Sequence, residues 1–125
     1  MTMSAYLRDK INDHWCKGAS YTPPTNLYAS LHTADPGTTG ANEVAGGSYA
    51  RQLCNSWNAS SGGNKTNSAD ILFSGMPAAT VTHVGLWDAS SGVNFLDGGA
   101  LGSSRTLQAG DALRIAAGQA TVGQS

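Results

Sequence analysis

The stretch that decides the fold is TVTHVGLWD, residues 80–88. Apolar side chains alternate along it, with Val84 and Leu86 on one face and Val81 and Trp87 on the other. Because both faces carry apolar groups, we expect this segment to be a central strand, covered on both sides.

Outward from this strand the chain reads as a series of short strands. The turn ASSG at residues 89–92 leads to a second apolar run, so residues 80–97 predict a β-hairpin. Further strands are expected at residues 26–32, 49–57, 69–73, 104–107, 112–115 and 119–122, separated by turns that include 58–67, 74–77 and 108–111. About seven or eight short strands with Gly-rich turns predict an all-β fold, an antiparallel sandwich or barrel-like sheet.

One helix is expected, at the N-terminus, over residues 3–17. Its apolar stripe recurs at intervals of four residues and consists of Met3, Leu7, Ile11 and Trp15. Ser4 is a suitable N-cap, and Lys17-Gly18 a suitable stop. Such a narrow stripe packs either on the body of the domain or in a groove on a neighbour, and the first alternative is favoured.

Residues 33–48 (TADPGTTGANEVAGGS) predict a long exposed loop, because they contain turn residues and too few apolar ones for an element of their own. Structureless segments of this length are uncommon in compact domains and often form binding surfaces. This loop is therefore the first candidate for contact with a partner.

Composition bounds the class of protein. A length of 125 residues suits one domain, residues 1–125, with one core. Charged residues make up only 12%, against about 25% in ordinary soluble domains, and the net charge is -1. Without a basic patch the chain is not expected to bind nucleic acid or an anionic membrane. A nearly neutral surface tolerates close packing of many copies, which favours an assembly component.

No metal or cofactor is expected. The histidines His14, His32 and His83 are scattered and lack the spacing that prepares a zinc site. Cys16 and Cys54 have no neighbouring ligand motif, so structural thiols are favoured over a disulfide.

Enzymatic motifs are missing from the sequence as well. It contains no nucleotide-binding glycine loop and no Gly-x-Ser-x-Gly elbow. His83 with Asp70 or Asp88 and a serine could form a triad, but serine is so abundant that chance explains the combination. The acidic residues lie mostly in predicted turns, which they stabilise; they are Asp9, Asp13, Asp35, Glu43, Asp70, Asp88, Asp97 and Asp111. A small-molecule substrate is therefore not expected.

Several aromatic residues could stack on sugar rings, which would suit a receptor-binding fibre tip. In strands such residues more often form core or interface. They are Tyr28, Tyr49, Trp57 and Trp87.

Three segments carry a resemblance to a known family. Residues 27–37 (LYASLHTADPG), 42–52 (NEVAGGSYARQ) and 81–88 (VTHVGLWD) resemble small structural proteins of tailed bacteriophages and prophages, often labelled tail fibre-like and similar to capsid cement or decoration proteins. The likeness extends from the N-terminal helix to residues 109–118. Similar chains end in an alternating strand, whereas residues 119–125 are short and polar. The resemblance implies a virion protein and carries no catalytic residues.

Together these observations predict a non-enzymatic, homo-oligomeric virion protein, made in the cytoplasm of the host bacterium. The favoured role is capsid cement: a homotrimer that binds the outside of the head and stabilises contacts of the major capsid protein. The alternative is a tail fibre or fibre-associated protein that contacts tail proteins and takes part in host attachment. A small hydrolase acting on the host envelope is a third possibility, for which no catalytic centre is visible. The residues expected to contact partners are Leu7, Ile11, Trp15, Asp35, Glu43, Val44 and Tyr49.

Overall fold

A computed structural model of the chain describes residues 2–16, 18–22, 24–59, 61–62, 64–118 and 121–123. One helix, α1 (Ala5–Cys16), precedes most of the strands. The strands are β1 (Thr2–Met3), β2 (Tyr28–His32), β3 (Gln52–Leu53), β4 (Asn64–Thr66), β5 (Ile71–Met76), β6 (Ala79–Trp87), β7 (Phe95–Leu107), β8 (Asp111–Ile115) and β9 (Thr121–Gly123). The chain is thus mainly β, as predicted, and its sheets do not close into a barrel.

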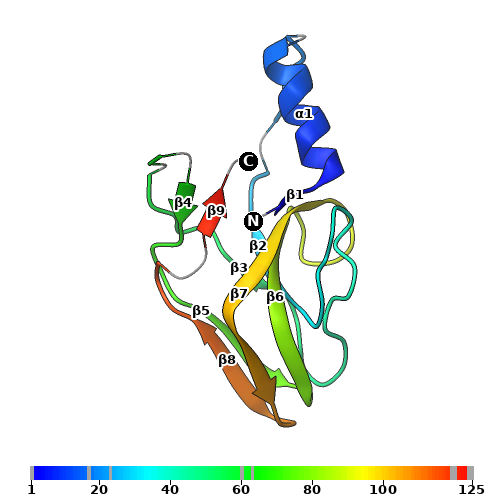
Figure 1. Ribbon diagram of the computed structural model, residues 1–125, viewed down its shortest axis with the longest axis vertical. Helices are drawn as coiled ribbons and strands as arrows, with labels where there is room; N and C mark the ends of the chain where they lie inside the picture. Colours follow the sequence, from blue (N-terminus) through cyan, green and yellow to red (C-terminus); the bar gives the residue numbers. More distant parts are fainter. Residues whose placement is uncertain are drawn as a thin grey trace.

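The largest sheet has the strand order β1-β7-β6-β2-β3, with every pair antiparallel (Figure 1). The predicted central strand is confirmed as β6, which lies between β7 and β2. The predicted hairpin is confirmed too, since Trp87 pairs with Phe95 across the turn. Residues 84–87 are all buried, as expected of a strand with apolar groups on both faces.

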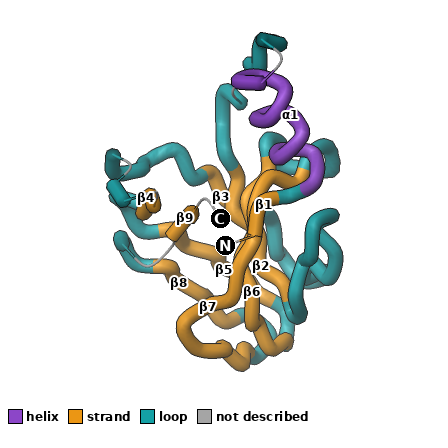
Figure 2. The backbone as a smooth tube through the Cα atoms, turned by 45° about the horizontal axis from the view of Figure 1, so that its top comes forward, coloured by secondary structure: helices purple, strands orange, loops and turns teal. Residues whose placement is uncertain are grey.

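Two small two-stranded sheets, β5-β8 and β4-β9, complete the fold (Figure 2). The core forms where the main sheet meets the β5-β8 pair. Its buried residues are Ala29, Leu31, Val44, Cys54, Ile71, Phe73, Met76, Val81, Val84, Leu86, Leu107, Leu113 and Ile115. Strand β8 follows β7 in sequence but pairs with β5, so the predicted turn at 108–111 leads the chain from one sheet to the other.

The long strand β7 joins what the sequence predicted as two strands, the second strand of the hairpin at 80–97 and a separate strand at 104–107. Gly98 lies within this strand because close packing requires it: an added Cβ would lie 2.7 Å from Phe95 and 2.7 Å from Pro36. A similar correction applies at 74–77, where β5 continues through a bulge to Met76. Gly75 has a φ of 63°, which a glycine-containing bulge tolerates.

The predicted strand at 49–57 is much shorter in the structure. Only β3 and a single bridge between Trp57 and Asn67 form there. The segment 58–67, predicted as a loop, contains β4, whose partner is β9 near the C-terminus. The predicted last strand, 119–122, overlaps β9, although residues 119 and 120 lie outside the described residues.

The helix begins two residues later than predicted. Met3 pairs with Asp97 in β1 and belongs to the sheet, so it is not part of the helical stripe. Ser4 is confirmed as the N-cap, because its Oγ accepts the backbone N–H of Leu7 at 3.1 Å. Gly18 follows with a φ of 74°, while Lys17 lies outside the described residues. No helix in the described part of the chain is long and apolar enough to cross a membrane.

Candidate functional site

The predicted contact residues fall into two separate groups. Leu7, Ile11 and Trp15 lie along α1, whereas Asp35, Glu43, Val44 and Tyr49 belong to the segment that crosses the opposite end of β2. The structure does not bring the two groups together into one site.

Helix α1 projects from the body of the domain (Figures 1 and 2). Its start is fixed to the sheet, since the Ser4 N–H donates to the Leu96 carbonyl at 2.8 Å. No residue of α1 is buried, and Trp15 near its end is 72% exposed. The prediction that the stripe packs on the body therefore holds at Leu7 and Ile11, which are half-buried, and fails at Trp15.

The segment 33–48 is confirmed as a long, mostly exposed loop, and it is anchored to the body at a few buried positions. Val44 is buried in the core, and its N–H donates to the Leu31 carbonyl at 2.9 Å. Gly40 lies against the Trp87 ring so closely that an added Cβ would be 2.5 Å from it. Asp35 makes the predicted turn, because its Oδ1 accepts the Gly37 N–H at 2.8 Å.

A half-buried ion pair holds this segment. Glu43 accepts hydrogen bonds from Arg51 at 2.8 and 2.9 Å and from the Tyr49 hydroxyl at 2.8 Å. Arg51 also donates to the carbonyls of Ala89 and Gly92, both at 3.1 Å, and its guanidinium stacks 3.6 Å from the Trp87 ring centroid. Burial alone would raise the pKa of Glu43, but the hydrogen bonds from Arg51 and Tyr49 outweigh it and hold the pKa below its usual value. Glu43 and Tyr49 thus act as structural residues.

A buried serine–histidine pair lies on β2. The Trp87 indole N–H donates to Ser30 Oγ at 2.9 Å. His32 Nδ1 donates to the Ala41 carbonyl at 2.8 Å, so in the neutral ring Nε2 accepts the Ser30 hydroxyl at 2.7 Å. Burial lowers the pKa of His32, which favours this neutral form. The arrangement resembles a nucleophile–base pair, but Ser30 and His32 are each 0% exposed and Ser30 is already engaged by Trp87. We assign it a structural role.

The described residues offer few other candidates for a reactive, metal-binding or sugar-binding site. Cys16 is exposed, Cys54 is buried, and both are free. No group of three or more His, Cys, Asp or Glu residues among those described is placed to hold a metal ion. The two tryptophans considered for sugar stacking are not free to do so: Trp87 is buried, and Trp57 is half-buried with its indole N–H donating to the Cys54 carbonyl at 2.8 Å.

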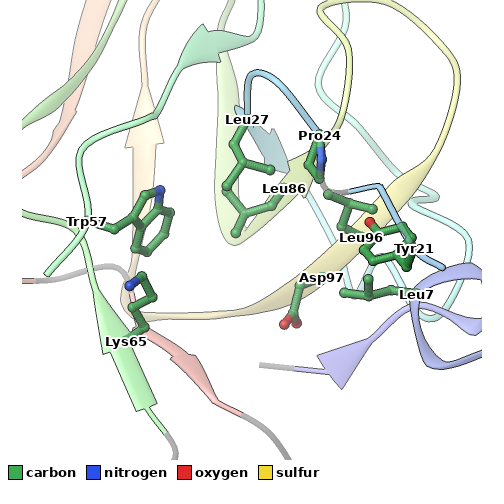
Figure 3. A pocket seen from close by; sticks show the side chains of 9 residues that line it. All are labelled: Leu7, Tyr21, Pro24, Leu27, Trp57, Lys65, Leu86, Leu96 and Asp97. Carbon is green, nitrogen blue, oxygen red and sulfur yellow. The ribbon is translucent and has the colours of Figure 1, made fainter. Parts of the chain in front are cut away.

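An apolar pocket of about 210 Å³ lies between the base of α1 and the main sheet (Figure 3). Leu7 reaches it from α1, and Leu86 and Leu96 reach it from β6 and from β7. The full lining consists of Leu7, Tyr21, Pro24, Leu27, Trp57, Lys65, Leu86, Leu96 and Asp97.

Asp97 is the unusual member of this lining. It is 1% exposed, its Oδ1 accepts the Gly98 N–H at 2.8 Å, and its Oδ2 has no hydrogen-bond partner among the described residues. Burial raises the pKa of Asp97 to about 6. The sequence interpretation of Asp97 as a turn residue is therefore wrong. The burial of Asp97 could have been predicted from its position, because this carboxyl stands between Leu96 and Gly98 in an otherwise apolar run. The turn interpretation is confirmed for Asp88 and Asp111, which accept backbone N–H groups of their own turns.

Replacing Asp97 with asparagine should stabilise the protein at neutral pH. Because the native carboxyl binds its proton more tightly than the unfolded chain does, the free energy of unfolding should fall as pH rises from about 4 to 6. The full loss is about 3 kcal/mol, since one pKa unit corresponds to about 1.4 kcal/mol. Urea unfolding of the wild type and of Asp97→Asn between pH 4 and 8 measures this contribution as the difference between their free energies of unfolding at each pH. The exposed Asp9→Asn variant is the charge-matched control, and an equal difference for it would contradict the prediction.

Comparison with known proteins identifies one matching family. None of the curated proteins matches the chain. One family model does match, described as Podophage GP4 fiber I protein gp80, and it covers residues 2–123, nearly the entire chain. A protein of such a family is a structural, virion-associated component. The mainly β chain with its projecting α1 belongs to the Podophage GP4 fiber I protein gp80 family.

Proposed function

We propose that the chain is a non-enzymatic component of a tail fibre or of its attachment to the virion. The observation that carries this proposal is the family match over residues 2–123, whose description names a fibre protein. The earlier preference for capsid cement rested on composition and resemblance, and neither of them distinguishes head from tail.

The geometry supports a role in binding other proteins. Among the described residues the large exposed hydrophobic side chains are Trp15, Leu53, Leu72 and Val93, and Trp15 at 72% is the most exposed of them. Trp15 lies on an element that projects from the body, so a neighbouring protein can reach it without any change in the core. We propose α1 as the principal attachment element, in place of the segment 33–48 favoured by the sequence, because the anchoring of that segment leaves less of it free.

Copy number and position on the virion test the proposal. Antibodies against the purified chain, gold-labelled on intact virions, should mark the tail, and quantitative mass spectrometry against the major capsid protein should give a few to a few tens of copies. An antibody against the major capsid protein serves as the control for access to the head. Label spread over the head at hundreds of copies would overturn the fibre proposal and establish capsid decoration.

A further inference from the structure

The two strands that flank Asp97 are held very differently. Asp97 pairs with Leu86 of β6 on one side and with Met3 of β1 on the other. Strand β6 is central in the main sheet, whereas β1 is a strand of two residues at its edge. Of these two neighbours, β1 can leave the sheet at the lower cost in free energy.

The N-terminal arm, which we define as residues 2–7, is attached to the body by few contacts. It consists of β1, the buried cap Ser4 and the first residues of α1. The Ser4 N–H donates to the Leu96 carbonyl at 2.8 Å, and Leu7 is half-buried beside the apolar pocket. From there α1 projects from the body and contains no buried residue (Figure 1). Terminal segments with so little buried surface open locally, well below the free energy of global unfolding.

The docked arm leaves the carboxyl of Asp97 poorly solvated. Asp97 is 1% exposed, its Oδ1 accepts the Gly98 N–H, and its Oδ2 has no partner among the described residues. Met3 lies beside it on the same face of the sheet, because directly paired residues of antiparallel strands share a face. A carboxylate in this position loses its hydration without full compensation, whereas a protonated carboxyl loses much less. Loss of the proton therefore acts against the docked arm.

We propose that the N-terminal arm docks on β7 while Asp97 carries its proton and is released when that proton is lost. Release admits water to the carboxylate without disturbing β6 or the core. It also moves Leu7 away from the pocket and frees the base of α1, so the helix changes its orientation relative to the body. This inference goes beyond the fibre proposal, because it concerns a conformational change of the chain wherever it lies on the virion.

The titratable groups around Asp97 do not reverse this direction. Lys65 and Tyr21 share the pocket lining with it (Figure 3), and burial raises the pKa of Tyr21, which stays neutral. The flanking residues Met3 and Leu86 are uncharged. The positive charge of the amino terminus lowers the pKa of Asp97, but burial outweighs it and raises the pKa from 3.8 to about 6. Because the raised pKa belongs to the docked state, docking is strongest below about pH 4 and weakens as the pH rises through about 6.

Hydrogen exchange of backbone amides, followed by NMR on the full chain from pH 4 to 8, is the first test. The Ser4 N–H reports the docked arm, because it donates to the Leu96 carbonyl. After correction for the intrinsic effect of pH on exchange, its protection should fall by roughly fiftyfold, since release lowers the pKa of Asp97 by about two units. The Gly110 N–H, which donates to the Met76 carbonyl in the turn before β8, should keep its protection.

Two variants and one reference amide assign the effect. Asp97→Asn keeps the size of the side chain without its charge, so the protection of Ser4 should be the same at pH 4 and pH 8. Asp9→Asn, at an exposed position of α1, should retain the fall seen in the wild type. The Leu86 N–H in the central strand should exchange much more slowly than that of Ser4. The proposal is overturned if the protection of Ser4 equals that of Leu86, does not change with pH, or falls as far in Asp97→Asn.

The thiol of Cys16 at the end of α1 provides a second readout that needs no substitution. Cys16 is exposed and Cys54 is buried, so a maleimide fluorophore attaches at Cys16. Time-resolved anisotropy should show the label tumbling with the domain at pH 4 and gaining a faster local motion at pH 8. An anisotropy decay that is the same at both pH values would contradict release. Because both tests use the isolated chain, their failure is distinct from a failure of the fibre proposal, which is judged on virions.

Discussion

Replacing Arg51 with alanine should lower the free energy of unfolding by about 3–5 kcal/mol. The variant leaves the Glu43 carboxylate, whose side chain is 23% exposed, without its cationic partner. It also removes the donors to the Ala89 and Gly92 carbonyls and the stacking on Trp87. Because these contacts join residues 43, 51 and 87–92, their loss should loosen the segment 33–48 and the hairpin turn together.

Urea unfolding followed by circular dichroism measures this effect. Arg114→Ala is the matched control, because Arg114 pairs with Asp70 at 3.4 Å on an exposed surface and should contribute less than about 1 kcal/mol. Arg51→Lys should recover only part of the loss, since an ammonium cannot satisfy two carbonyls and a carboxylate with the guanidinium geometry. A loss at Arg51 no larger than that at Arg114 would show that the ion pair does not hold the fold.

Replacing Gly85 with alanine should destabilise the protein by about 3 kcal/mol or more. An added Cβ would lie 2.7 Å from His32 Nε2, 2.7 Å from Ser30 Oγ and 2.8 Å from Phe95. All three groups are buried, and the first two hydrogen-bond each other, so none can move without breaking a contact. One methyl group should thus disrupt the network that joins β2 to β6.

Comparing the thermal unfolding of this variant with that of Gly110→Ala distinguishes the effect of a steric clash from the effect of backbone strain. Gly110 has a φ of 89° and open space around it, so alanine there should cost only about 1 kcal/mol through its unfavourable backbone conformation. Equal losses at the two positions would mean that the close packing around Gly85 does not limit stability.

The fold class was predictable because β6 and its hairpin are specified by local pattern. Alternation over residues 80–88 and a Gly-containing turn indicate a central strand whatever the remaining chain does. The short strands β3 and β4 were misjudged because they pair with distant segments, β2 and β9, and carry little pattern of their own. The length of β7 was missed because Gly98 has no side chain to continue an alternating pattern, although it is required by the neighbouring Phe95 and Pro36.

The candidate site was only half predictable. The apolar stripe Leu7, Ile11 and Trp15 is a property of the sequence, since a period of four residues places these side chains on one face of a helix. Whether that face is buried or exposed depends on where the sheet ends, which periodicity does not reveal. Glu43 and Tyr49 were predicted to face a partner, but they are committed to Arg51.

The sequence by itself determined that this chain is a small antiparallel β-domain with one amphipathic helix and that it resembles phage structural proteins. Alternation, turn chemistry and capping act between near neighbours, so they can be read along the chain. Only the tertiary structure decided that α1 projects, that Arg51 anchors the segment 33–48, and that Asp97 is buried beside an apolar pocket. These features depend on contacts between residues tens of positions apart, and burial, ion pairing and pocket shape exist only once those residues have met.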